Sequence, residues 1–412
     1  MNGKLIGNAI VGQSGGPTAA INATLAGVIK GALSNGAIKT VYGMRNGIEG
    51  MLAERLVDLG DIFLDESKLD MLIHTPAAAL GSCRKKLPDP KSEKAEDMAF
   101  FEKVFEIFKK YDIRYFFYIG GNDSMDTVLK LSRFAGEHDY EMRVVGVPKT
   151  VDNDLMVTDH TPGFGSAAKY VAVTMKEILR DVSVYTTKAV TIVEIMGRDA
   201  GWLTASAALT KVSGGISPDL VYLPEVAFDP DEFISSINKI FEDHPAVLVA
   251  VSEGIRLADG KYIGEGKGAT DAFGHKSLSG AGKVLEEFVK EKIGCKVRSM
   301  ELSLTQRCAG HILSATDINE SLAVGAGAVE AAVSGRTGVM MTIERKAGDE
   351  YSSVVGCADI STIANEVRGV PRDYINAEGN GITEKGLSYL APLIIGEVDV
   401  EYENGLPKHI VI

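Results

Sequence analysis

The sequence contains few cysteines and no long apolar run. The four cysteines are Cys83, Cys295, Cys308 and Cys357. They form no Cys-x-x-Cys pair, so they exclude the disulfide framework of a small secreted protein and are typical of reduced thiols in a cytosolic one. Because no apolar stretch approaches the ~18–20 residues that cross a bilayer, we expect no transmembrane helix.

Basic residues are fewer than acidic ones. The sequence has 43 Lys+Arg against 56 Asp+Glu, a net charge of −13, which argues against nucleic acid or an anionic membrane as the main partner. The first residues, MNGKLIGNAIVGQSGG, contain no apolar signal region with a cleavage site. We therefore expect a cytoplasmic protein, and its net charge is compatible with a local basic pocket inside an acidic surface.

Glycine, in contrast, is in excess, at 45 of 412 residues, or about 11% against a usual ~7%. This excess indicates tight turns or backbone that approaches a ligand. The hydrophobic fraction of 45% and the charged fraction of 24% are ordinary for a globular protein and exclude intrinsic disorder and a coiled coil. The length fits two or three lobes of roughly 100–200 residues each.

Short apolar runs rich in Val, Ile and Tyr alternate along the chain with longer amphipathic stretches. The expected strands are Leu5–Val11, Ile38–Tyr42, Tyr115–Ile119, Val144–Val147, Val190–Ile195, Val247–Val251 and Val339–Ile343. The expected helices are Ala19–Lys30, Glu93–Tyr111, Met125–Phe134, Ala167–Leu179, Asp231–Phe241, Gly282–Ile293 and Ile318–Val333. This alternation predicts βαβ units and a parallel sheet with helices on both faces, and seven strands fit two such lobes better than one.

Glycine pairs follow two of the expected strands. Residues 12–18 read Gly-Gln-Ser-Gly-Gly-Pro-Thr, and residues 120–124 read Gly-Gly-Asn-Asp-Ser. In open α/β sheets, ligands bind beyond the carboxyl ends of strands, where glycines and a helix N-terminus let backbone N–H groups reach an anion. Neither segment is a Walker A loop or a G-x-G-x-x-G motif, and each alone fits an ordinary strand-to-helix turn. Their repetition favours a ligand site.

Charged residues follow other expected strands. Residues 148–154, PKTVDND, combine Lys149 and Thr150 with two carboxylates. A carboxylate here can take a proton from a substrate hydroxyl, and Lys149 can neutralise phosphate charge, although a solvated polar loop is the alternative. Further candidates are Arg198 after Met196 and Gly197, Glu253, the basic cluster at residues 81–86, Arg298 and Arg307. Singly, each arginine fits a surface charge; together, these groups point to phosphate chemistry on a polyhydroxylated substrate.

Several motifs, taken in order, resemble those of the phosphofructokinase family. They are SGGPTAAIN (14–22), GSCR (81–84), GGNDS (120–124), PKTVDND (148–154), MGR (196–198), SEG (252–254) and QR (306–307). The resemblance spans most of the chain and implies an α/β fold of two Rossmann-like three-layer α/β/α lobes with the active site in the cleft between them. It implies a larger lobe on the phosphoryl-donor side, residues 1–163 and 308–360, and a smaller one on the sugar-phosphate side, residues 164–307 and 361–412.

Two positions bear on the phosphoryl donor. ATP-using relatives typically carry glycine at the positions of Asp123 and Lys149, so the resemblance is to the pyrophosphate-dependent branch. A carboxylate at Asp123 would occupy the space of a nucleotide α-phosphate and repel its charge, whereas Lys149 balances a compact pyrophosphate. The implied reaction is the reversible, pyrophosphate-dependent phosphorylation of fructose 6-phosphate to fructose 1,6-bisphosphate, in glycolysis or gluconeogenesis. The alternatives are an ATP-dependent 6-phosphofructokinase and the same chemistry on sedoheptulose 7-phosphate.

The resemblance also assigns roles to individual residues. It implies that Asp152 is the general base on the sugar 1-hydroxyl and that the cofactor is Mg²⁺, in a homodimer or homotetramer. The other implied catalytic residues are Lys149, Asp123 and Arg198. The implied pyrophosphate ligands are Gly15, Gly16, Arg84 and Lys149. The implied sugar-phosphate ligands are Thr150, Asp152, Met196, Gly197, Arg198, Glu253, Arg307 and, from a neighbouring subunit, Arg298. Metal would contact Asn122 and Asp123, although Asn122 replaces the family's usual aspartate and Leu304 replaces a histidine or tyrosine that touches the substrate phosphate.

Two interpretations from other classes compete with a kinase. A non-catalytic sugar-phosphate sensor on the same fold would have lost its base, but Asp152 is present. A nicotinamide-dependent dehydrogenase would rest on the glycine-rich residues 163–168, which do not directly follow an expected strand and have no evident phosphate clamp.

Overall fold

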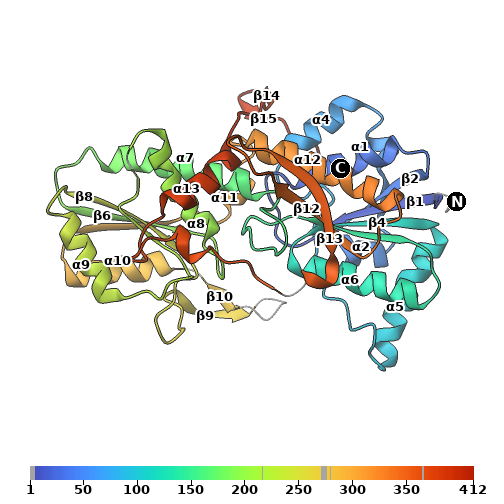
Figure 1. Ribbon diagram of the computed structural model, residues 1–412, viewed down its shortest axis with the longest axis horizontal. Helices are drawn as coiled ribbons and strands as arrows, with labels where there is room; N and C mark the ends of the chain where they lie inside the picture. The colour runs from blue at the N-terminus through green and yellow to red at the C-terminus, as the bar shows by residue number, and fades with distance from the viewer. Residues whose placement is uncertain (1–4, 216, 271–275, 279, 364–365) are drawn as a thin grey trace.

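The computed structural model describes residues 5–215, 217–270, 276–278, 280–363 and 366–412, and its strands form two main sheets (Figure 1). In order across the larger sheet, the strands are β13 (Ser353–Asp359), β12 (Val339–Arg345), β5 (Arg143–Pro148), β4 (Ile113–Gly120), β1 (Gly7–Gln13), β2 (Ile38–Met44) and β3 (Leu56–Asp58). The smaller sheet has the order β11 (Lys296–Glu301), β6 (Ala189–Ile195), β8 (Ala246–Ser252) and β7 (Leu220–Tyr222). Two hairpins pair β9 (Glu265–Thr270) with β10 (Lys276–Leu278) and β14 (Tyr402–Glu403) with β15 (Leu406–Pro407).

All seven expected strands are present, and the prediction of parallel pairing holds except at the edges of the larger sheet. There β3 and β13 run antiparallel to their neighbours β2 and β12. The expected strands did not include β3, β7, β11 or β13. Strands β3 and β7 have only three residues each, and most residues of β11 and β13 are exposed or partly exposed. The smaller sheet is parallel throughout.

Helices cover both faces of the larger sheet. One face carries α1 (Ile21–Leu33), α3 (Leu59–Ile62), α4 (Glu66–His74) and α12 (Ala315–Val333), and the other carries α2 (Gly47–Leu52), α5 (Ala95–Lys110) and α6 (Asn122–Glu137). Helices α1 and α12 lie so close that a Cβ on Gly27 would sit 2.2 Å from the backbone oxygen of Leu322, and one on Gly325 would sit 2.1 Å from that of Thr24. Part of the glycine excess therefore serves helix packing, which the sequence alone did not distinguish from ligand binding.

The smaller lobe, built around the smaller sheet, is also a three-layer structure. One face carries α7 (Phe164–Val182), α8 (Trp202–Ser206) and α13 (Glu384–Leu390), and the other carries α9 (Pro230–Ile240) and α10 (Ala281–Lys292). The remaining short helices are α11 (Thr305–Cys308), η1 (Ala207–Ser213), η2 (Ile360–Thr362), η3 (Arg372–Tyr374) and η4 (Ala391–Ile394). The two lobes confirm the predicted α/β architecture (Figure 1). Within the described ranges, no helix is long and apolar enough to cross a membrane.

The end of the chain departs from the predicted division into lobes. Residues 361–412 were expected in the smaller lobe, but Ile410 and Ile412 pack against the core of the larger sheet. Arg45 of the larger lobe donates a hydrogen bond to the backbone oxygen of Ile412 at 2.7 Å. Apolar residues after η4 lie beside α1 and α12, because this part of the chain offers side chains that can cover their remaining apolar surface. The other boundaries stay a prediction.

Candidate active site

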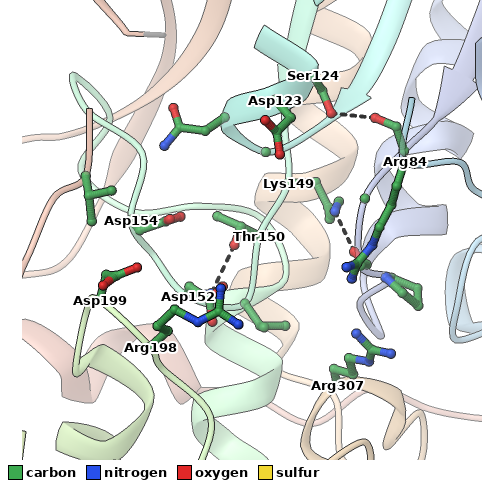
Figure 2. A pocket seen from close by; sticks show the side chains of 18 of the residues that line it. Arg84, Asp123, Ser124, Lys149, Thr150, Asp152, Asp154, Arg198, Asp199 and Arg307 are labelled. Carbon is green, nitrogen blue, oxygen red and sulfur yellow. Dashed lines mark hydrogen bonds between the residues drawn. The ribbon is translucent and has the colours of Figure 1, made fainter. Parts of the chain in front are cut away.

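The carboxyl ends of strands from both sheets border one cavity of about 500 Å³ (Figure 2). Most of the sequence-predicted site residues line it: Gly15, Gly16, Arg84, Asn122, Asp123, Lys149, Thr150, Asp152, Met196, Arg198, Glu253 and Arg307. Figure 2 shows Arg84, Lys149 and Arg307 on one side of the view and the carboxylates of Asp154 and Asp199 on the other. The cavity thus joins a basic side to an acidic one.

Two predicted ligands do not line this cavity. Arg298 is exposed on β11, so a role at the site would require a neighbouring subunit, and that role stays a prediction. Gly197 lies behind the cavity wall, where its N–H group donates to the Glu253 carboxylate at 3.2 Å. With a φ of 136° and a carbonyl oxygen 2.5 Å from where its Cβ would be, this position favours glycine.

Lys149 stands at the end of β5, directly below the glycine turn that follows β1. Its side chain is 3% exposed, and its Nζ donates to the backbone oxygen of Gly16 at 2.5 Å. Burial lowers the pKa of Lys149 to about 8, although Asp152 and Asp154 act in the opposite direction. The amine is therefore mostly protonated near neutral pH, and an anion placed beside it stabilises this charge.

The same glycine turn brings two arginines together. A Cβ on Gly16 would lie 3.0 Å from Nη1 of Arg307 and 3.9 Å from Nη2 of Arg84. Burial lowers the pKa of the Arg307 guanidinium, and the nearby charge of Arg84 lowers it further. These like charges repel one another, and an anion bound between them would relieve that repulsion. The glycine turn and its cations therefore form a site suited to a compact polyanion.

Two carboxylates face the cations across the cavity. Burial raises the pKa of Asp152, against the lowering effect of Lys149 and Arg198. Burial also raises the pKa of Asp154, with a further contribution from Asp152, to about 7. Thr150 holds the turn by accepting the Asp152 N–H at 3.1 Å. A carboxylate with a raised pKa beside a cavity is a suitable proton acceptor near neutral pH.

Glu253 completes the acidic side at the end of β8. Its carboxylate accepts the N–H of Gly197, and burial raises its pKa to about 7. Near neutral pH this group can both donate and accept a hydrogen bond, which suits a sugar hydroxyl.

The start of α6 forms the wall next to the glycine turn. The hydroxyls of Ser14 and Ser124 lie 2.5 Å apart and join the turn after β1 to the turn after β4. Asp123 forms an ion pair with Lys86 at 3.5 Å. Both glycine turns therefore belong to one site, as their repetition in the sequence predicted.

The start of α6 offers the side-chain oxygens of two residues, Asn122 and Asp123, to a divalent cation. The amide nitrogen of Asn122 donates to the backbone oxygen of Glu366 at 2.8 Å, while its buried amide oxygen has no hydrogen-bond partner in the described structure. Among the described residues, no group of three or more His, Cys, Asp or Glu could hold a metal ion. One amide oxygen and the neighbouring Asp123 suit a cation such as Mg²⁺, which keeps waters and takes most of its ligands from substrate phosphates.

Several residues of the cavity were given no individual role from the sequence, although some lie in segments that the sequence singled out. They are Ser14, Pro17, Cys83, Lys85, Lys86, Tyr118, Gly121, Ser124, Thr127, Val151, Asp154, Asp199, Ala200 and Val367. Many belong to or adjoin the quoted motifs, so proximity to a motif was a usable signal. No sequence signal pointed to Val367, because it comes from a distant segment without a recognisable pattern.

Comparisons with known proteins agree with this geometry. The family model described as Phosphofructokinase matches residues 8–332. The chain is 42% identical to the pyrophosphate–fructose 6-phosphate 1-phosphotransferase of Xanthomonas campestris pv. campestris, with 98% of this chain and 96% of the relative covered. It is 41% identical to the protein of that name from Halomonas elongata, with 97% and 95% covered.

A solved structure extends the likeness to the whole fold. The crystal structure of a pyrophosphate-dependent phosphofructokinase from Nitrosospira multiformis matches with a TM-score of 0.88 and 39% sequence identity, and the match covers 98% of this chain and 96% of that one. Motifs, fold and cavity thus lead to one conclusion: the chain is a member of the phosphofructokinase family.

Proposed function

We propose that this protein transfers a phosphoryl group reversibly from pyrophosphate to the 1-hydroxyl of fructose 6-phosphate. The observation that carries the proposal is the buried Lys149 amine beneath the Gly15–Gly16 turn, with Arg84 and Arg307 on the same side of the cavity. Lys149 and Arg84 beside the glycine turn balance a compact, highly charged donor, and Arg307 extends the basic side toward the phosphate of the sugar. The names of relatives about 40% identical to this chain support pyrophosphate as that donor.

The arrangement assigns each step to a residue. Asp152 accepts the proton of the sugar 1-hydroxyl as that oxygen forms a bond to the near phosphorus of pyrophosphate. The bond from this phosphorus to the bridging oxygen breaks, and inorganic phosphate leaves. Lys149, Arg84 and Arg198 stabilise the charge that develops on the phosphoryl oxygens. Enzymes of this family generally need a divalent metal; we propose Mg²⁺, held by Asn122 and Asp123, to neutralise phosphate charge.

The sugar is proposed to lie toward the smaller lobe. Its proposed ligands are Thr150, Asp152, Met196, Gly197, Arg198, Glu253, Arg307 and, from a neighbouring subunit of a homodimer or homotetramer, Arg298. With the donor against the turns of the larger lobe, residues 1–163 and 308–360 form the donor side and residues 164–307 and 361–396 the sugar side. Sedoheptulose 7-phosphate presents the same reacting end, so it is a second candidate acceptor. We place the enzyme in the cytoplasm.

The reverse reaction tests this function. Fructose 1,6-bisphosphate and inorganic phosphate, supplied with Mg²⁺, are expected to yield fructose 6-phosphate and pyrophosphate. The reason is that the proposed pyrophosphate and metal ligands serve both directions of the reaction. Phosphorus NMR follows the new pyrophosphate signal. Chelation of the metal is expected to abolish turnover, and added Mg²⁺ to restore it. Turnover that survives complete metal removal would contradict the proposed metal role.

The carboxylate of Asp123 is proposed to exclude nucleotides. In Asp123→Gly, we expect measurable phosphorylation with ATP and weaker binding of pyrophosphate, because the variant removes both the bulk and the charge that oppose a nucleotide α-phosphate. Calorimetric titration of both ligands measures the change. Asp126→Gly is the control for the loss of a carboxylate from this helix. Asp126 also lies on α6, where it forms an ion pair with Lys130 at 2.7 Å. No gain of nucleotide binding in Asp123→Gly would contradict the steric and charge argument.

A further inference from the structure

Residues 366–370 form a bridging segment that contacts both sides of the cavity. The backbone oxygen of Glu366 accepts the side-chain amide of Asn122 at 2.8 Å, and Val367 lines the cavity. Farther along, the N–H of Val370 donates at 2.8 Å to Glu225 of the smaller lobe. This short segment therefore connects the start of α6 with the smaller lobe.

Arg368, at the centre of the bridging segment, holds the loop that carries Asp152 and Asp154. Its N–H donates to the backbone oxygen of Asp154 at 2.8 Å. Its guanidinium donates to the backbone oxygen of Thr158 at 2.9 Å and to that of Asp159. Three backbone carbonyls of one loop are thus fixed by a single residue that does not itself line the cavity.

The loop that Arg368 holds is strained. Asn153 and Val157 have φ values of 54° and 68°, a left-handed conformation that is costly above all for a β-branched residue such as valine. Strain of this kind, on the order of 1–3 kcal/mol per residue, persists only where the surroundings enforce it. The loop therefore needs an external support to keep Asp152 in place.

Tyr389 adds a second support that Arg368 orients. The Arg368 guanidinium donates to the Tyr389 hydroxyl at 3.0 Å, and that hydroxyl donates to the backbone oxygen of Asp159 at 2.6 Å. The amide of Asn153 also donates to this hydroxyl, at 3.3 Å. Loss of the guanidinium would therefore affect both supports.

Trp202 fixes the opposite side of Arg368. The indole N–H donates to the backbone oxygen of Arg368 at 2.9 Å, and the guanidinium lies 4.7 Å from the centre of the indole ring. Trp202 is fully buried and is the only tryptophan of the chain. Its fluorescence therefore reports on the position of Arg368.

We propose that Arg368 is a positioning residue that keeps the Asp152–Asp154 turn in its reactive geometry through the backbone of residues 154–159. The inference rests on the proposed function, in which Asp152 accepts the substrate proton. It extends that function to a residue outside the cavity and outside every motif that the sequence presented. A residue that merely joined the lobes would affect stability without selectively lowering kcat.

The test compares Arg368→Met with Arg372→Met, and adds Arg368→Lys. Arg372 is a matched control because its guanidinium also binds backbone oxygens, those of residues 375–377, but contacts neither the loop nor the cavity. In Arg368→Met we expect kcat to fall about 10²-fold, the effect of misplacing a catalytic group by about 1 Å. The KM for fructose 6-phosphate is expected to stay within about threefold, and Arg368→Lys to recover part of the rate.

Hydrogen exchange of the ligand-free protein supplies a readout that does not depend on turnover. The N–H groups of Thr150 and Thr161 are hydrogen-bonded across the loop, and the N–H group of Asp159 is bonded to the backbone oxygen of Ile343 on β12. We expect all three to exchange about tenfold faster or more in Arg368→Met. A shift of Trp202 emission is expected in the same variant, and neither change in Arg372→Met. Unchanged exchange in Arg368→Met, or faster exchange with a normal kcat, would overturn the proposal. A wild-type protein that does not use pyrophosphate would overturn the proposed function instead, and the exchange data would still show whether Arg368 holds the loop.

Discussion

In the Asp152→Asn variant, kcat for phosphorylation of fructose 6-phosphate is expected to fall by about 10²–10⁴-fold, the usual effect of removing a general base. The KM values of both substrates are expected to stay within a few-fold, because the side chain keeps its size and the backbone N–H of residue 152 keeps its hydrogen bond to the Thr150 hydroxyl. Asp199→Asn is the control, since Asp199 also lines the cavity but pairs with Arg256 at 2.6 Å. Steady-state kinetics of the three proteins measures the difference, and near-normal turnover in Asp152→Asn would contradict the role of the base.

Stability separates this loss from unfolding. Burial raises the pKa of Asp152, so the folded protein holds this proton more tightly than the unfolded chain, and ionisation at neutral pH weakens the fold. Asparagine cannot ionise. The variant is therefore expected to melt at the same temperature as the wild type or higher at pH 7, while its activity is lost. The acid limb of the wild-type kcat profile, where Asp152 takes up a proton, is expected to flatten in the variant.

Lys149→Met is the second variant with a large expected effect. It removes the buried cation that lies beneath the glycine turn, and we expect kcat/KM for pyrophosphate to fall by about 10²–10³-fold, as when one preorganised donor to transition-state charge is lost. Lys130→Met is the matched control, because the Lys130 amine also donates to a backbone oxygen, that of Leu87 at 2.8 Å, but does not line the cavity. Equal effects of the two substitutions would argue against a role for Lys149 in donor binding.

The pH dependence identifies the charge on Lys149 as the cause. With a pKa of about 8, the free enzyme loses this charge as the pH rises through that value, so wild-type kcat/KM for pyrophosphate is expected to decline above about pH 8. Lys149→Arg keeps its charge throughout this range. It is expected to lack the decline even if its rate is lower, and an unchanged alkaline limb would assign the limb to another group.

Much of this architecture could be predicted from local patterns. The seven apolar strands and the helices between them follow from periodicity, because buried strands of parallel sheets are continuous apolar runs. Most of the cavity could be anticipated for a related reason: parallel strands place the residues after their carboxyl ends at one edge of the sheet. Lys149, Asp152 and Glu253 were found in this way.

What could not be predicted depends on contacts between distant segments. Strands β11 and β13 pair with their neighbours by backbone hydrogen bonds, and most of their residues are exposed or partly exposed. Arg368 is more than 200 residues from the backbone oxygens that it binds, and no spacing relates the two segments. The hydrogen bond between Arg45 and the backbone oxygen of Ile412 likewise joins segments that are far apart in the sequence.

The measurement that tests the central claim most directly supplies fructose 6-phosphate and Mg²⁺ with pyrophosphate in one reaction and ATP in another. Formation of fructose 1,6-bisphosphate is followed in both, with donor concentrations matched. We predict turnover with pyrophosphate and none with ATP, because Asp123 and Lys149 shape the donor site for a compact polyanion. Turnover with ATP alone would contradict this account and show that these two residues do not set the donor.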